Sequence, residues 1–357
     1  MPPTDHASRP QPSRARAARS HSFQICCALL AIACGGGGGT EPPEPEPLPP
    51  APALESIAYE RLGSGKLAFR RVSDGNYLYV IDASARAVTA LNMYPLSADP
   101  ALSRDGSRIT YIAWSGFGQT NSSAYDVSTK GVAGADSQRV SALLGQESSP
   151  SWSSDGQSIY FFSTASPAGI YRQPVASSPL APTRVLTSDA EPCFILPDSP
   201  VSASATGRLA FSCASNVQTV NTDGSERRTL ISRTSPPGFA EAFYAPTWSP
   251  DAQWLAFLRV FQDPTSAASP VMLVVGVVRA DGSDARTVTS VNSGPIVQTI
   301  GHNNLSLAWS PDGSRLAFNV MAGGLTSHIH VVNIDGTGLV QVTTRTGTHD
   351  HSLTWVP

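Results

Sequence analysis

The sequence is short of charge and of catalytic motifs. Only 14% of its 357 residues are Asp, Glu, Lys or Arg. When the four arginines and one aspartate of residues 1–33 are set aside, 20 basic and 26 acidic side chains remain, and this acidic balance disfavours nucleic acid as a partner. The sequence has no GxSxG, HExxH, GxGxxG or GxxxxGK pattern. We therefore expect neither an enzyme nor a bound cofactor.

Long apolar runs are also missing, because the stretch Phe23 to Ala33 is too short to span a bilayer. It follows a basic segment, so residues 1–33 have the layout of a secretory signal. The run Leu29-Leu30-Ala31-Ile32-Ala33-Cys34 resembles the bacterial lipoprotein signal, although Ala31 stands where Leu is usual. We predict that Cys34 carries the lipid. The alternative is an ordinary cleaved signal followed by an incidental cysteine.

Residues 34–55 are predicted to be a tether. Gly35 to Gly39 are flexible, and the Pro/Glu run that follows cannot bury apolar surface. By resemblance to other lipoproteins, Gly35 directly after the lipidated cysteine favours the outer membrane, with the domain facing the periplasm. The lipid is then the only contact that we expect with a membrane.

The rest of the chain is rich in turn residues and carries an internal repeat. The 29 glycines, 30 prolines and 41% hydrophobic residues favour many short strands. One hairpin pattern recurs: an anchor residue, Ser, any residue, Asp-Gly, then an alternating strand with a closing aromatic. The clear copies begin at Leu102, Trp152, Trp248 and Trp309, and a weaker copy begins at Val201. The closing aromatics are Phe69, Tyr111, Phe161, Phe211, Phe257 and Phe318.

The sixth copy is divided between the two ends of the chain. Ser352 to Pro357 matches Ser306 to Pro311 but lacks the turn and the second strand, and Gly65 to Phe69 supplies the missing half. A second hairpin, at Val220, Val278 and Val332, completes four strands for each repeat. We therefore predict an all-β fold, a six-bladed propeller of four-stranded blades, closed by pairing of its first and last strands.

These hairpins resemble those of the TolB-like propellers with WD-type, WSPDG repeats, over residues 56–357. Ala252 in place of the turn glycine and Val201 in place of the anchor Trp depart from the pattern. The resemblance implies a non-enzymatic binding or scaffolding module that contacts a protein, peptide or glycan. Because a closed ring leaves no long sheet edge exposed, we expect a monomeric propeller.

Cys193 and Cys213 are the cysteines that remain after Cys26 and Cys27 leave with the signal and Cys34 takes the lipid. An exported protein lies in an oxidising compartment, so we predict a disulfide between Cys193 and Cys213. The alternative is two free, buried thiols.

Five of the seven histidines lie near the C-terminus: His302, His328, His330, His349 and His351. Imidazoles two residues apart on one strand share a face and could hold Zn or Mn. Some TolB-like propellers use channel histidines with a divalent ion to cleave acidic sugars, so a metal-dependent lyase or hydrolase is the alternative function. Packed or exposed histidines are the simpler interpretation, and we predict no metal.

The segment before each inner strand is predicted to open onto the mouth of the central channel. The residues at this place form a candidate binding rim: Glu147, Tyr244, Asn304, Asp350 and His351. Insertions at Gln262 to Pro270 and Ser290 to Asn304 are either specificity loops or neutral additions.

Overall fold

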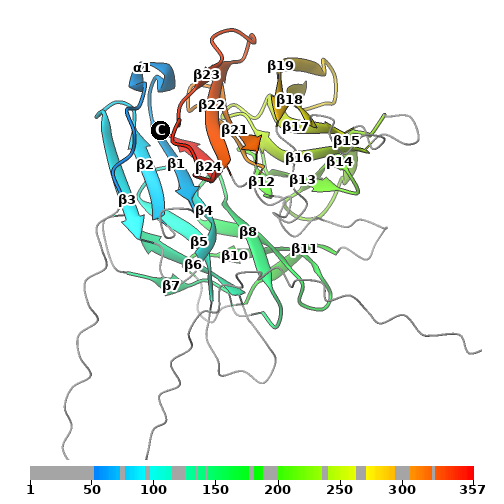
Figure 1. The fold of residues 1–357 in the computed structure, drawn as a ribbon. Coiled ribbons are helices and arrows are strands. Elements are labelled where there is room, and N and C mark those ends of the chain that lie inside the picture. Colours follow the sequence, from blue (N-terminus) through cyan, green and yellow to red (C-terminus); the bar gives the residue numbers. More distant parts are fainter. Residues whose placement is uncertain are drawn as a thin grey trace, which may run out of the picture. The chain divides into compact units, whose positions relative to one another are not determined.

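The repeats fold as predicted, into six antiparallel four-stranded sheets that form the blades of a propeller (Figure 1). The structure is a computed structural model. It describes residues 52–72, 77–92, 97–114, 125–132, 136–141, 143–176, 181–187, 200–234, 240–262, 271–293, 305–323 and 326–357. The predicted signal peptide lies outside the described residues, as does the predicted tether up to residue 51.

Each blade is given from its innermost strand outward. Blade 1 consists of β24 (Asp350–Val356), β1 (Lys66–Arg71), β2 (Tyr77–Asp82) and β3 (Ala87–Asn92), and blade 2 of β4 (Ser97–Leu102), β5 (Arg108–Trp114), β6 (Tyr125–Gly131) and β7 (Gln138–Arg139). Blade 3 consists of β8 (Glu147–Trp152), β9 (Ser158–Ser163), β10 (Gly169–Pro174) and β11 (Thr183–Thr187), and blade 4 of β12 (Ser202–Ala203), β13 (Arg208–Cys213), β14 (Asn216–Asn221) and β15 (Arg228–Ile231).

The last two blades contain the longest strands. Blade 5 consists of β16 (Ala240–Trp248), β17 (Trp254–Gln262), β18 (Val271–Arg279) and β19 (Arg286–Ser293), and blade 6 of β20 (Leu307–Trp309), β21 (Arg315–Gly323), β22 (Thr326–Asn333) and β23 (Val340–Gln341). One short helix, α1 (Tyr59–Leu62), precedes blade 1. Strands β17 and β21 each span nine residues, whereas β1, β9 and β13 span six. At about 3.3 Å per residue, blades 5 and 6 are therefore taller by roughly 10 Å.

The ring closes where the sequence predicted. Strand β24 pairs antiparallel with β1, and Trp355 lies opposite Leu67. Figure 1 shows β24, in red, beside β1, in blue. Each inner strand also contacts the inner strands of both neighbouring blades, in the closed cycle β24, β4, β8, β12, β16, β20. The two strands that close blade 1 are thus neighbours in space, although nearly all of the propeller lies between them in the sequence.

The hydrophobic core lies between the blades. The described residues form six buried clusters, one for each pair of neighbouring blades. The predicted closing aromatics belong to these clusters, and four of them, Phe69, Phe161, Phe211 and Phe318, are completely buried. Burial of one such side chain stabilises the fold by about 1.5–3 kcal/mol. Each copy of the sequence repeat therefore supplies the closing aromatic of one interface between blades.

The anchor tryptophans add a polar link between blades. The indole of Trp152 donates to the carbonyl of Ala101, at 3.1 Å, and the indole of Trp309 donates to the carbonyl of Thr247, at 3.0 Å. Each acceptor lies on the inner strand of the preceding blade. Trp152 and Trp309 thus fill the interface between blades and also link the inner strands, whereas the buried indole of Trp248 has no hydrogen-bond partner and that of Trp355 donates to the carbonyl of Ser64, before β1.

The predicted anchor of blade 4 was wrong by two residues. Ala203, not Val201, lies opposite Leu209, as Trp152 lies opposite Ile159. The Ser204 hydroxyl accepts from the amide four residues later, whereas in the other repeats this interval is five. A turn shorter by one residue and the missing Trp together concealed the register.

Candidate functional site

A central cavity of about 280 Å³ lies within the ring of inner strands. One lining residue in each blade directly precedes the anchor, and all six are small: Ala101, Ser151, Ser202, Thr247, Ala308 and Thr354. Prolines, among them Pro100, Pro150 and Pro246, and the anchor tryptophans complete most of the wall. The volume is close to the lower end of the range for ligand pockets, about 300 Å³.

The cavity wall carries little charge. Among the described lining residues the ionisable side chains are Asp99 and Arg104, both from blade 2. Burial raises the pKa of the Asp99 carboxyl, although a hydrogen bond from the Ser149 amide, at 3.2 Å, and the charge of Arg70 oppose this shift. The wall therefore offers apolar surface, hydroxyl groups and backbone groups.

Four of the six inner strands share a local distortion at the same place in the repeat. Asp99, Ser149, Ala245 and Ser352 have φ between +48° and +55°, and each lies three residues before its anchor. The pairing register shifts at the same places. A residue other than glycine costs about 1–2 kcal/mol in this conformation, so packing and hydrogen bonds around the four bulges must offset this cost.

The predicted rim residues lie in internal contacts. The Glu147 carboxylate accepts from the amide of Val127, at 2.7 Å, and from the Ser141 hydroxyl, and burial raises its pKa to about 7. Tyr244 is part of the core between blades 5 and 6. Asn304 lies outside the described residues. A ligand-binding role for this set remains a prediction.

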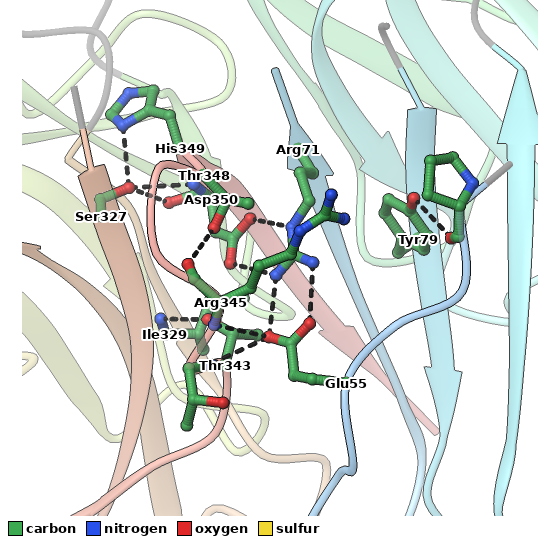
Figure 2. A network of polar contacts seen from close by, with 12 residues as sticks. Glu55, Arg71, Tyr79, Ser327, Ile329, Thr343, Arg345, Thr348, His349 and Asp350 are labelled. Carbon is green, nitrogen blue, oxygen red and sulfur yellow. Dashed lines mark hydrogen bonds and ion pairs between the residues drawn. The ribbon is translucent and has the colours of Figure 1, made fainter. Parts of the chain in front are cut away.

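Asp350 belongs to a buried ionic network that the sequence did not reveal (Figure 2). Arg71 donates to Asp350 through Nε, at 2.6 Å, and Nη2, at 2.8 Å. It also donates to Glu55 through Nη1, at 2.9 Å, and Nη2, at 3.1 Å. Arg71 and Asp350 have no solvent-exposed side-chain surface. Burial alone lowers the pKa of Arg71, but the two carboxylates outweigh it and the pKa is raised.

His349 and His351 lie next to this network, with their ring centroids 5.1 Å apart. The Ser327 hydroxyl donates its proton to the Asp350 carbonyl, so it must accept from Nδ1 of His349. This assigns the proton of His349 to Nδ1 and leaves its buried Nε2 without a hydrogen-bond partner. Burial and the charge of Arg70 lower the pKa of both histidines.

Of the other predicted histidines, two lie on β22 and one lies outside the described residues. His328 is buried on β22, and His330 stacks on Phe318 with ring centroids 5.8 Å apart. His302 lies outside the described residues. In the part of the chain that the structure describes, no group of three or more His, Cys, Asp or Glu side chains is arranged to hold a metal ion. The convergence that the metal-dependent alternative requires is therefore not found there.

The remaining predicted sites fall wholly or partly outside the described residues. Cys34 and Cys193 are not described, whereas Cys213 is buried at the end of β13. The lipidation and the disulfide therefore remain predictions. Most of the two predicted insertions, residues 263–270 and 294–304, also lies outside.

Comparison with known proteins places the fold. Neither a protein-family model nor a curated protein matches the sequence. TolB from Acinetobacter baumannii superposes with a TM-score of 0.61 at 15% identity, over 82% of this chain and 67% of that one. A putative TolB from Agrobacterium tumefaciens superposes with a TM-score of 0.53 at 15% identity, over 83% of this chain and 100% of that one. Hydrazine synthase from Kuenenia stuttgartiensis superposes with a TM-score of 0.52 at 12% identity, over 84% of this chain and 47% of that one. At these identities the likeness shows architecture: the chain has the fold of a TolB-like β-propeller.

Proposed function

We propose that the chain is a non-enzymatic binding or scaffolding propeller, held at the cell envelope by a lipid on Cys34, that contacts a protein, peptide or glycan through its central cavity. The observation that carries the proposal is the composition of the cavity wall, which all six inner strands build from small, proline and tryptophan residues. Such a wall recognises shape and apolar surface.

The same wall is poorly suited to acid–base chemistry. General acid–base catalysis needs titrating groups within hydrogen-bond reach of a reacting atom. The described lining contains no histidine, cysteine, glutamate or lysine, and the Asp99 carboxylate already accepts the Ser149 amide. A cavity of about 280 Å³ has room for one or two side chains of a partner or for a single sugar ring.

The location rests on the N-terminal sequence. A basic segment, a short apolar run and a cysteine favour export and lipidation. Among the described residues no helix is both long and apolar enough to cross a bilayer. The resemblance to TolB-like propellers, which commonly serve protein contacts, makes a protein or peptide the first partner to test.

The test is capture of partners from the native envelope with the cavity open or blocked. Ser151 lines the cavity, whereas Ser84 lies exposed in the turn between β2 and β3. We expect Ser151→Phe to abolish capture and Ser84→Phe, the same change on the surface, to preserve it. Equal capture by both variants would show that the cavity is not the binding site.

The anchor is tested separately by membrane fractionation. Cys34→Ser is expected to move the chain from the membrane fraction to the soluble periplasmic fraction without altering the propeller. If the variant stays with the membrane, or if the wild-type chain is soluble, Cys34 does not carry an anchoring lipid.

A further inference from the structure

Residues 52–57 contact both blade 6 and blade 1. Leu54 and Ile57 pack on the hydrophobic cluster that these two blades share. The Tyr79 hydroxyl donates to the carbonyl of Pro52, at 3.0 Å. Glu55 accepts from the backbone amide of Thr344, at 2.9 Å, in the segment that leads from β23 to β24. This short segment has no strand structure of its own. It contacts the chain on both sides of the pairing between β24 and β1, which we call the seam.

The ionic network around Arg71 joins three parts of the chain that meet at the seam. Arg71 belongs to β1, Asp350 to β24 and Glu55 to the N-terminal segment (Figure 2). The Arg71 side chain is fully buried, and the Glu55 side chain retains 16% of its exposure. A guanidinium that has lost its water is stable only while carboxylates and hydrogen bonds replace that water. Removal of Glu55 therefore leaves two N–H groups of Arg71 to be hydrated.

The seam is where the ring depends most on such contacts. In every other blade the inner strand and its partner are joined by a turn, but Arg71 and Asp350 are 279 residues apart. Closing a loop of this length costs more entropy than closing a tight turn. Side-chain contacts across the seam must offset that cost.

The N-terminal segment is itself weakly held. Pro52, Ala53 and Ser56 are exposed, and its attachment consists of two apolar side chains, the bond to Tyr79 and the bonds of Glu55. Elements with few buried contacts open at a small fraction of the global free energy of unfolding. A segment with few buried contacts therefore supports the strand pair on which closure depends.

We propose that residues 52–57 are a clasp that docks and undocks, and that its docking sets how firmly β24 is held on β1. Undocking hydrates Arg71 and loosens the seam, while blades 3 to 5 stay unchanged because, among the described residues, the contacts of the clasp lie in blades 1 and 6. The clasp leads back to Cys34, so tension on an anchored N-terminus reaches it before it reaches β1. Only this last consequence rests on the proposed function.

Hydrogen exchange on the full chain tests the proposal. We expect Glu55→Gln to speed the exchange of the β1 and β24 amides about tenfold, with blades 3 to 5 unchanged. Glu226→Gln is the matched control, because Glu226 pairs with Arg208 at 3.4 Å on the surface of blade 4, with 71% of its side chain exposed. This control is expected to leave the seam unchanged.

Leu54→Ala provides a second measurement if the charge variant folds poorly, since it weakens the apolar part of the clasp and keeps the ion pair. It should give a smaller increase in exchange at the same two strands. No change in either variant, or an increase spread evenly over all six blades, would overturn the clasp. Neither result touches the cavity or the lipid, so the proposed function would stand.

Discussion

The two ends of the inner strands are held in opposite ways. At the end where an inner strand turns into its partner, the same contact between a serine and an exposed aspartate recurs in blades 2, 3, 5 and 6. At the other end the polar contacts are buried, and each blade has its own. The first end is local in sequence, whereas the contacts of the second join separate strands, which at Arg71 and Asp350 are 279 residues apart. The two ends therefore differ both in what they contribute to stability and in how far the sequence reveals them.

The turn end is a clamp made of Ser and Asp. In the turn of blade 2, Ser103 donates to the Asp105 carboxylate, at 2.6 Å, and the Ser107 amide donates to the same oxygen, at 3.0 Å. These bonds lower the pKa of Asp105 to about 2. The same clamp closes the turns of blades 3, 5 and 6, through Asp155, Asp251 and Asp312. The carboxylates of the Asp-Gly turns thus cap the backbone.

The opposite end contains carboxylates that are buried and unlike one another. Asp350 pairs with Arg71, Glu147 accepts backbone and hydroxyl protons, and Glu241 pairs with Arg259. A buried charge is costly unless it is fully paired, so the loss of one partner here matters more than the loss of a surface contact. This difference can be measured.

The largest expected effect is at the seam. Asp350→Asn removes one charge from the buried pair and should lower the free energy of unfolding by about 3 kcal/mol, measured by urea denaturation. Asp335→Asn is the same change at an exposed turn and should leave the midpoint almost unmoved. Equal losses in the two variants would show that the buried pair contributes no more to stability than a carboxylate in an exposed turn.

The pH dependence should come from the buried end. Burial lowers the pKa of His349 and His351, while unfolded histidines bind protons below about pH 6.5. Stability is therefore present above that pH and lost as the pH falls, with a slope approaching about 1.4 kcal/mol per pH unit for each histidine. Glu147, with its pKa raised to about 7, acts in the opposite direction, because its stabilising effect is lost as the pH rises from 4.5 to 7.

Two variants separate these contributions. Between about pH 7 and pH 5, His351→Gln should lose less stability than the wild-type chain, and Glu147→Gln should lose more. Thermal unfolding at a series of pH values measures both. Parallel curves for all three proteins would mean that neither group titrates differently in the folded state.

A smaller effect is expected at the turn end. Asp312→Ala removes the acceptor for Ser310 and Ser314 and should cost about 1 kcal/mol, comparable to the loss of a helix cap. Chemical denaturation measures the change. A loss as large as that of Asp350→Asn would show that the clamp carries more than local turn stability.

The smallest expected effect is a gain. Ala252 has φ +57° where the other turns between an inner strand and its partner have glycine at φ +66° to +77°, so Ala252→Gly should raise stability by about 0.5–1 kcal/mol. Gly156→Ala is the reverse test, since nothing lies within 4 Å of the added methyl group and only backbone strain is introduced. A loss in Ala252→Gly would mean that the buried methyl group outweighs the strain.

The repeat could be predicted from the sequence because its determinants are neighbours in the chain. The Asp-Gly turns, the alternating strands and the closing aromatics lie within ten residues of one another in each copy. Even the pairing of Ser352 to Pro357 with Gly65 to Phe69 followed, since each half of the divided copy resembles half of a complete one. The register of blade 4 did not follow, because Ala203 carries none of the anchor's features.

The candidate site could be predicted from the sequence only in part. Which residues line the cavity depends on the bulges at Asp99, Ser149, Ala245 and Ser352, and these residue types share no feature that predicts positive φ. Arg71 and Glu55 gave no signal at all. The sequence pattern places Glu55 in the tether, whereas its ion pair with Arg71 and its hydrogen bond from the Thr344 amide place it on the propeller.

The sequence by itself determined the blade, the number of blades and the order in which they close, because a hairpin is specified by turn chemistry and period-two patterning over a few residues. The tertiary structure alone decided which charges are buried together at the seam, how the rim side chains are engaged and what the cavity wall offers. Burial and pairing depend on segments far apart in the chain, and no local pattern records which distant carboxylate will meet a given arginine.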